Sequence, residues 1–307
     1  MPRRWTCPTG PESAVSRPDR STGRGLAIET LFEAPESAAT SVRGGALPHG
    51  LAARYGPRLE IPLRPDRPTV IANFVTSLDG VVALGEDSSG GGEISGFFEP
   101  DRFIMGLLRT LADAILIGAG TLGATANHVW TAGRVNPAST DSYAAWRTQL
   151  GLSQPQPTTV IVTGSGRLNV RHPALTDPRV PVVLLTTPAG AAVLHSEPMG
   201  ENVQLAVAGT GPRLTAAVII DALAGLGIRL ALCEGGPHLL GDLVAAERLD
   251  ELFLTEAPQL LGRDEQQRRL SLVQGFAAGP GGGRWAELRS VRRAADHLFL
   301  RYRLRPR

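Results

Sequence analysis

Compact apolar runs alternate with helix-like segments from residue 69 onward. The apolar runs span residues 69–76, 113–118, 158–163, 180–187, 203–208, 228–233 and 252–257. Between the runs, apolar positions recur every three or four residues, which predicts helices near 100–111, 141–150, 188–194, 213–226 and 238–248. Strands and helices in alternation predict right-handed crossovers and an α/β fold with a largely parallel sheet that is covered by helices on both faces.

The C-terminal segments 285–292 and 296–305 have no helical pattern between them. They predict an antiparallel pair that closes one edge, so the sheet is expected to be mixed. Within 301–305, arginine alternates with Tyr and Leu, which is typical of a half-buried strand. We interpret these arginines as charges that keep an exposed strand from pairing with other chains, in preference to a nucleic-acid-binding surface.

Residues 1–65 show no sustained period and are rich in Pro, Ser, Gly, Ala and Arg, apart from an apolar patch at 26–32. This composition predicts an arm that is mostly disordered or loosely docked, followed by one domain over 66–307. The sequence contains no apolar run of the roughly 18 residues that a membrane span needs, and no signal-peptide pattern. We therefore expect a cytoplasmic protein that binds no membrane.

Composition excludes several classes of chemistry for this chain of 307 residues. All 31 Lys and Arg residues are arginine, so a Schiff-base lysine, a pyridoxal-phosphate enzyme, a Walker A loop and protein-kinase chemistry are excluded. The two cysteines, Cys7 and Cys233, are too few for a disulfide framework or a cysteine-based zinc site. No metal is expected.

Ligands of open parallel sheets bind at the carboxyl ends of strands, so the turns after the apolar runs are the first candidates. One run ends in Gly118-Ala119-Gly120-Thr121, the start of a G-x-G-x-x-G match whose backbone N–H groups would approach a pyrophosphate. A standard Rossmann unit would then require a second strand ending in an acidic residue, and residues 125–134 provide no such strand. We consider a true Rossmann site the weaker alternative.

A second turn, Glu234-Gly235-Gly236-Pro237, joins an apolar run to an amphipathic helix. Two glycines and a proline at a helix start leave N–H donors free to bind an anion, although a tight structural connection would also use glycine. The Glu234 carboxylate at a strand end is costly to bury unless a polar group meets it.

The third turn follows Asn73, whose amide interrupts a run that looks buried and must find a partner or a ligand. Ser77 and Asp79 fall in the turn itself, where a structural Asx-turn explains Asp79 equally well. On the helix near 100–111, Arg109 lies off the apolar stripe. It is solvated in the simplest interpretation, and it would bind a phosphate with its guanidinium fork if one arrived there.

The motifs Asn73…Ser77-Leu-Asp-Gly80, Leu107-Leu-Arg109, Cys233-Glu-Gly-Gly-Pro237 and Leu249-Asp-Glu-Leu together resemble the reductase domain of bacterial riboflavin biosynthesis. That domain is the C-terminal half of a bifunctional deaminase-reductase and has a dihydrofolate-reductase-like fold. The similarity spans about residues 67–305. It implies a homodimer and an NADPH-dependent reduction in which the ring-opened ribose of a phosphoribosylamino-pyrimidine becomes a ribityl chain.

The resemblance also implies roles for individual residues. The cofactor would be held by Gly118, Ala119, Gly120, Thr121, Thr163, Ser165, Thr186, Gly235, Gly236 and Pro237. The substrate would face Asn73, Ser77, Asp79, Arg109 and Glu234, with Asp79 as the candidate for the proton path. From its place in a turn after a strand, we further expect Arg167 to meet a 2′-phosphate and so to favour NADPH over NADH.

The sequence departs from this family at two places. His195-Ser-Glu197 matches the start of a zinc-deaminase motif, but no cysteine pair follows, so the chain is not that deaminase. After the Gly-Ala-Gly-Thr turn, the family continues with Ala-Asp-x-Pro and a further Arg, whereas this chain has Thr125-Ala-Asn-His128 and a later Arg134. The substrate therefore stays open between a phosphorylated pyrimidine and a pterin, with a dihydrofolate-reductase-like enzyme and a non-catalytic dinucleotide-binding protein as alternatives.

Overall fold

The computed structural model describes residues 26–35, 41–85, 90–264 and 268–306. Its strands are β1 (Glu29–Glu33), β2 (Val42–Ala46), β3 (Arg58–Pro62), β4 (Thr69–Ser77), β5 (Val81–Ala83), β6 (Ala114–Gly118), β7 (Thr158–Thr163), β8 (Val182–Thr186), β9 (Val203–Val207), β10 (Leu230–Cys233), β11 (Glu251–Ala257), β12 (Leu270–Ser271), β13 (Ala286–Ala294) and β14 (His297–Leu304). Its helices are α1 (His49–Tyr55), α2 (Gly91–Ile94), α3 (Glu99–Leu111), α4 (Ala119–Gly123), α5 (Ala132–Val135), η1 (Pro137–Ser139), α6 (Thr140–Gln149), α7 (Pro173–Thr176), α8 (Pro188–Leu194), α9 (Ala216–Gly225) and α10 (Pro237–Ala245).

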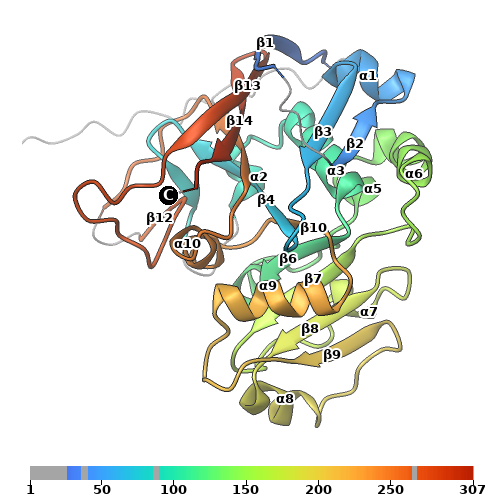
Figure 1. Ribbon diagram of the computed structural model, residues 1–307, viewed down its shortest axis with the longest axis vertical. Coiled ribbons are helices and arrows are strands. Elements are labelled where there is room, and N and C mark those ends of the chain that lie inside the picture. The colour runs from blue at the N-terminus through green and yellow to red at the C-terminus, as the bar shows by residue number, and fades with distance from the viewer. Residues whose placement is uncertain (1–25, 36–40, 86–89, 265–267, 307) are drawn as a thin grey trace, which may run out of the picture.

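A ten-stranded sheet runs through the described part of the chain in the order β1-β13-β14-β11-β4-β10-β6-β7-β8-β9 (Figure 1). The strands from β11 to β9 in this order pair in parallel. β14, β13 and β1 add antiparallel pairs at the other end. The mixed, mostly parallel sheet predicted from the sequence is confirmed.

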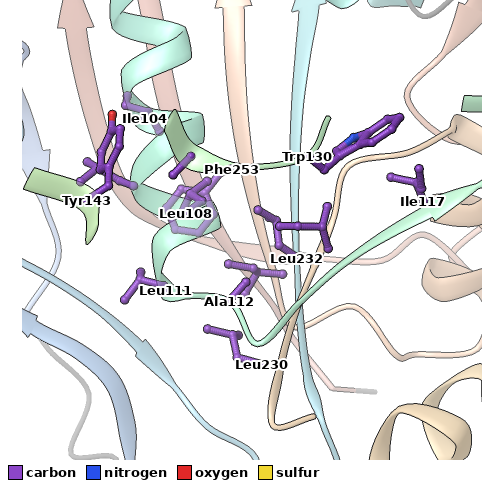
Figure 2. Close-up of a cluster of buried hydrophobic side chains, with 14 of the residues drawn as sticks. Ile104, Leu108, Leu111, Ala112, Ile117, Trp130, Tyr143, Leu230, Leu232 and Phe253 are labelled. Atoms are coloured by element: carbon purple, nitrogen blue, oxygen red, sulfur yellow. The ribbon is translucent and has the colours of Figure 1, made fainter. Parts of the chain in front are cut away.

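Helices cover both faces of the sheet because successive strand residues point to opposite sides. On β6, Ile115 and Ile117 pack with α3 and α6 in one buried cluster, whereas Leu116 packs with α9 and α10 in another. Figure 2 shows the first cluster, in which Leu108 of α3 lies near Leu232 of β10. This two-sided burial explains why the parallel strands read as continuous apolar runs.

The segment preceding β4 is part of the folded domain, which corrects the expectation of a loosely docked arm for residues 26–35 and 41–65. β1 pairs with β13, and β2 pairs with β3. Ile28, Leu51 and Ile61 are buried in the same core cluster as α3. The apolar residues of this segment form only short groups, such as the patch at 26–32, and show no sustained helical or strand period that would predict their burial. Residues 1–25 and 36–40 lie outside the described residues.

The C-terminal arginines do not line an exposed edge. β14 lies between β13 and β11, and β13 is itself covered by β1. The Arg301 side chain is buried, and its guanidinium pairs with Glu251 of β11 at 2.7 Å. Arg303 pairs with the other oxygen of the same carboxylate at 3.0 Å. These arginines therefore hold two neighbouring strands together instead of protecting an edge. In the described residues, no helix has the length and apolarity to cross a bilayer.

Candidate functional site

A cleft of about 770 Å³ opens where β4, α3 and the carboxyl ends of β6 and β10 meet. Its wall includes apolar side chains, such as those of Met105, Trp130 and Leu239. Its polar and glycine lining is formed by Asn73, Ser95, Asp101, Arg102, Arg109, Gly118, Gly120, Thr121, His128, Arg134, Glu234 and Gly236. Residues widely separated in the sequence thus share one cavity, which is the size expected of a small-molecule site.

The two glycine turns predicted to bind a dinucleotide face this cleft together. β6 and β10 are neighbouring parallel strands, and the Gly236 N–H donates a hydrogen bond to Thr121 Oγ1 at 3.0 Å. A side chain at Gly118 or Gly120 would point into open space, so a ligand can approach the backbone closely there. Pro237 also lines the cleft, at the start of α10. These residues fit the diphosphate part of a nicotinamide cofactor.

Ala119 and Gly235 lie behind this surface and do not line the cleft. A Cβ atom at Gly235 would come within 2.7 Å of Thr121 Oγ1, so Gly235 allows the two turns to pack against each other. Both residues contribute to the shape of the cradle without facing its open side.

Arg109 and Glu234 form a buried ion pair in the cleft wall. Arg109 Nη2 lies 2.6 Å from Glu234 Oε2, and Arg109 Nε donates to Oε1 at 2.9 Å. The two side chains are only 1% and 5% exposed. The Thr131 carbonyl accepts a further bond from Arg109, and the His128 ring lies 2.9 Å from Arg109 Nη2. Burial and the neighbouring Arg109 charge lower the pKa of His128 to about 3, so its ring is neutral and accepts that bond.

This pairing corrects the expectation that Arg109 is solvated and ready for phosphate. α3 is buried on almost every side, so the Arg109 side chain meets Glu234, Thr131 and His128 instead of water. Most of the guanidinium donors are occupied within the protein. Arg109 therefore holds Glu234 in the wall of the cleft, and its charge offsets the unfavourable desolvation free energy of that buried carboxylate.

Asn73 remains a substrate-binding prediction that the geometry supports. Its side chain is 7% exposed, lines the cleft and forms no hydrogen bond within the described part of the chain. Buried amides usually have partners, so this side chain is available to a ligand.

Sequence analysis missed Asp101, which lies in the first turn of α3 and lines the same cleft. Thr255 Oγ1 donates to Asp101 Oδ1 at 2.6 Å. Burial raises the pKa of Asp101 to about 6, against the opposing effect of the bonds from Thr255 and Ser95. Asp101 occupies the helical spacing of the stripe that includes Ile104 and Leu108, and a carboxylate on an apolar stripe is the sequence signal that could have found it.

Ser77 and Asp79 are not among the residues that line the cleft, so their contact with substrate stays a prediction. Ser77 Oγ donates to Asp79 Oδ1 at 2.6 Å, and Asp79 also accepts from the backbone N–H groups of Leu261 and Gly262. These bonds lower the pKa of Asp79 to about 2. A carboxylate that stays ionised and bonded in this way is a poor proton donor. The Val81 N–H donates to Ser77 Oγ and not to Asp79, so the two residues brace the turn by tying it to the segment after β11, which differs from the local Asx-turn alternative.

Thr163 and Thr186 are buried and also fall outside the cleft. Thr186 Oγ1 donates to the Thr163 carbonyl at 2.6 Å, and Thr163 Oγ1 accepts from the Gly166 N–H at 3.1 Å. They shape the turn after β7, and their contact with the cofactor stays a prediction. Ser165 and Arg167 are exposed on that turn, and Arg167 has no side-chain partner among the described residues. Their cofactor contacts stay predictions.

Two further arginines in the cleft were not singled out as site residues. Arg102 packs over the Phe97 ring at 5.2 Å, and Arg134 donates to the Asn127 carbonyl at 3.3 Å. Neither forms an ion pair with a described residue. Arg102 precedes Arg109 by two helical turns, a spacing that places both on one face of α3. Within the described ranges given above, no group of three His, Cys, Asp or Glu side chains could hold a metal.

Comparisons with known proteins place the chain among related sequences and structures. A curated relative from Methanothermobacter thermautotrophicus, named 2,5-diamino-6-ribosylamino-4(3H)-pyrimidinone 5′-phosphate reductase, is 29% identical over 196 residues, covering 64% of this chain and 80% of the relative. A pyrimidine reductase-like structure from Corynebacterium diphtheriae is 22% identical at a TM-score of 0.57, covering 78% of this chain and 93% of the other.

A solved deaminase and 5-amino-6-(5-phosphoribosylamino)uracil reductase from Thermotoga maritima is 18% identical at a TM-score of 0.56. The match covers 78% of this chain but only 57% of that longer protein. These structures show the shared fold and confirm the expected architecture. The RibD C-terminal domain profile matches residues 68–295. The resemblance inferred from the motifs is thereby confirmed, and the chain belongs to the RibD C-terminal domain family.

Proposed function

We propose that this protein is an NADPH-dependent reductase of a phosphoribosylamino-pyrimidine in riboflavin biosynthesis. The glycine turns around Gly120 and Gly236 would hold NADPH, which when bound would supply the hydride for C1 of the ring-opened ribosyl group. A proton from a polar group or water in the cleft completes the addition, so that the ribosyl group becomes a ribityl chain and NADPH becomes NADP⁺. The protein contributes mainly by positioning the two reactants and excluding water.

The observation that carries this proposal is the single cleft in which cofactor-type and substrate-type residues meet. Gly120 and Gly236 form the glycine-lined part of the cleft. Asn73 and the Arg109–Glu234 pair lie on the same cavity wall. A dinucleotide held by the glycine turns would therefore have a polar, partly buried chamber beside it. Family membership and the activity named for the archaeal relative support the same conclusion.

Arg102 and Arg134 favour a phosphorylated sugar substrate over a pterin. Both line the cleft, and neither is neutralised by an ion pair with a described residue. Guanidinium groups bind phosphate with paired hydrogen bonds, whereas a dihydropterin ring offers no such anion. A pterin without an acidic tail would leave these two charges without a role.

The direct test supplies purified protein and NADPH with the ribosylamino-pyrimidine phosphate, in its 2-amino or its 2-oxo form, and follows loss of reduced-nicotinamide absorbance. We expect consumption of at least one form and a ribityl product by mass spectrometry, with no turnover of dihydrofolate. Turnover of dihydrofolate alone would favour the pterin alternative. Nicotinamide binding without turnover of any of these compounds would favour a non-catalytic binding protein.

Cofactor preference is tested on Arg167, which lies on the turn after β7, next to β6 in the sheet. We propose that its free guanidinium meets the 2′-phosphate of NADPH, so Arg167→Ala should lower the NADPH-to-NADH affinity ratio by about tenfold. Arg171→Ala, which removes another exposed arginine from the same loop, serves as the matched control. An unchanged ratio in Arg167→Ala would exclude this residue as the determinant.

Light scattering on the same samples tests the homodimer that the family leads us to expect.

A further inference from the structure

Asp101 is a buried acid in the wall of the cleft, at the start of α3. It is 5% exposed, it lines the cleft, and it forms no ion pair with a described residue. Thr255 on β11 holds one carboxylate oxygen at 2.6 Å. An uncharged side chain in this place would avoid the cost of desolvating a carboxylate. The arrangement is therefore expected of a group held ready for a ligand.

A polar group without a hydrogen-bond partner among the described residues faces the same side of the sheet. Thr255 pairs in register with Val75 of β4, and Asn73 lies two residues before Val75. Alternate strand residues share a face, so Asn73 and Thr255 both point toward α3 and Asp101. The Asn73 amide has no hydrogen-bond partner in the described chain. Asn73 and Asp101 together present acceptors and donors to a flat, polar ring.

The two possible pyrimidine rings differ at the edge that a carboxylate would recognise. A 2-amino-4(3H)-pyrimidinone presents its N3–H and its 2-amino group side by side, and these two parallel donors match the two oxygens of a carboxylate. After hydrolytic deamination, the 2-position carries a carbonyl oxygen instead. That oxygen would face the acidic group without a proton between them, which is unfavourable in a buried site.

We propose that Asp101, positioned by Thr255, binds the N3–H and 2-amino edge of the substrate and makes this enzyme selective for the pyrimidine that still carries its 2-amino group. This inference rests on the proposed function and names its substrate class. The raised pKa of Asp101, about 6, agrees with a carboxylate that becomes ionised near neutral pH and is further stabilised by ring donors. The reduced product keeps the amino group, so a hydrolytic deamination of the ring must follow this reduction.

The first test compares kcat/KM for the 2-amino substrate and its 2-oxo counterpart. In the wild type we expect a preference of about 100-fold or more for the 2-amino ring, because a site built to bind donors rejects an analogue that lacks one. Asp101→Asn places one acceptor and one donor at the same position, which suits the 2-oxo ring. We expect that variant to lose the preference or to reverse it.

Glu93→Gln is the matched control, since it removes another carboxylate from the cleft wall at an exposed position. It should keep the wild-type ratio of the two kcat/KM values. A wild type that reduces both rings equally, or an Asp101→Asn variant with the wild-type ratio, would overturn the assignment while leaving the proposed reductase function intact.

Binding of the bare rings separates the two proposals without the cofactor. Calorimetry with wild-type protein should show that 2,5,6-triaminopyrimidin-4-one binds at least about tenfold more tightly than 5,6-diaminouracil. The Asp101→Asn variant should bind them about equally. If this ring preference appears but neither ribosyl phosphate is reduced, the selectivity of Asp101 stands and the proposed function fails. Equal binding of the two rings by the wild type contradicts the role of Asp101.

Discussion

Burial of an ionisable residue in the cleft lowers the unfolding free energy of the protein. The pKa of Asp101 is about 6 in the folded protein, mainly because of burial, and that of an unfolded aspartate is about 3.9. Because the folded pKa is raised, the stabilising contribution of the protonated form is complete below about pH 4 and is lost as the pH rises through about 6. Over this window the unfolding free energy falls by about 3 kcal/mol.

Asp101→Asn should remove this pH dependence and raise the unfolding free energy by about 2–3 kcal/mol near pH 8. The asparagine Oδ1 can still accept the hydrogen bond from Thr255. Guanidinium unfolding of both proteins between about pH 4 and pH 8 measures the difference. Curves that run parallel across this range would show that burial of Asp101 is less costly than inferred.

The Arg109–Glu234 pair should behave differently from a surface ion pair. Arg109→Met leaves the Glu234 carboxylate buried without its partner, so we expect a loss of about 3–5 kcal/mol in unfolding free energy. Replacing both residues, with Glu234→Leu added, should restore much of that loss. Arg179→Met breaks the exposed pair with Asp177 and should change stability little. A small effect of Arg109→Met would mean that water or His128 compensates for the lost charge.

At the scale of elements, the segment from β1 to β3 belongs to the core. Leu51 of α1 is 1% exposed and packs in the cluster that includes α3. Leu51→Ala should lower the unfolding free energy by about 2–5 kcal/mol, because it leaves a cavity between α1 and the domain. Val193→Ala on α8, where the side chain is 39% exposed, should change it by no more than about 0.5 kcal/mol. Equal effects in the two variants would restore the interpretation of a loosely docked arm.

At the scale of the whole molecule, the cleft depends on the packing of two turns that are far apart in the sequence. A methyl group at Gly235 would press on Thr121, whose hydroxyl accepts the bond from Gly236. Gly235→Ala should therefore separate the turns and weaken NADPH binding by about tenfold or more. Gly225→Ala, at an open position on α9, is the control. Nicotinamide fluorescence titration measures both, and equal affinities would show that the cradle tolerates the added methyl group.

The local pattern of apolar and polar positions was sufficient to predict most of the strands and helices of the parallel part of the sheet. The sequence predicted the parallel strands between β4 and β11 and the helices α3, α6, α8, α9 and α10. The signals were the hydrophobic period of each element and the turn residues that bound it, because each element buries a repeating set of apolar positions. The turns at Gly118–Thr121 and Gly235–Pro237 were predicted to face one site because parallel strands end at the same edge. Their shared cleft confirms that expectation.

The remaining features depend on contacts between distant segments, which a single sequence does not display. The sequence pattern predicted that Arg109 and Arg301 are exposed charges. In the folded protein, Arg109 is paired with Glu234 and Arg301 with Glu251. In the sequence, Asp101 looks like an ordinary acidic residue at the start of a helix. Only the fold shows that Thr255 of β11 donates a hydrogen bond to it. Hydrophobic period reports which side of an element is buried, but the partner of a buried charge is chosen by chain packing. The chemistry of this cleft is set by such partners.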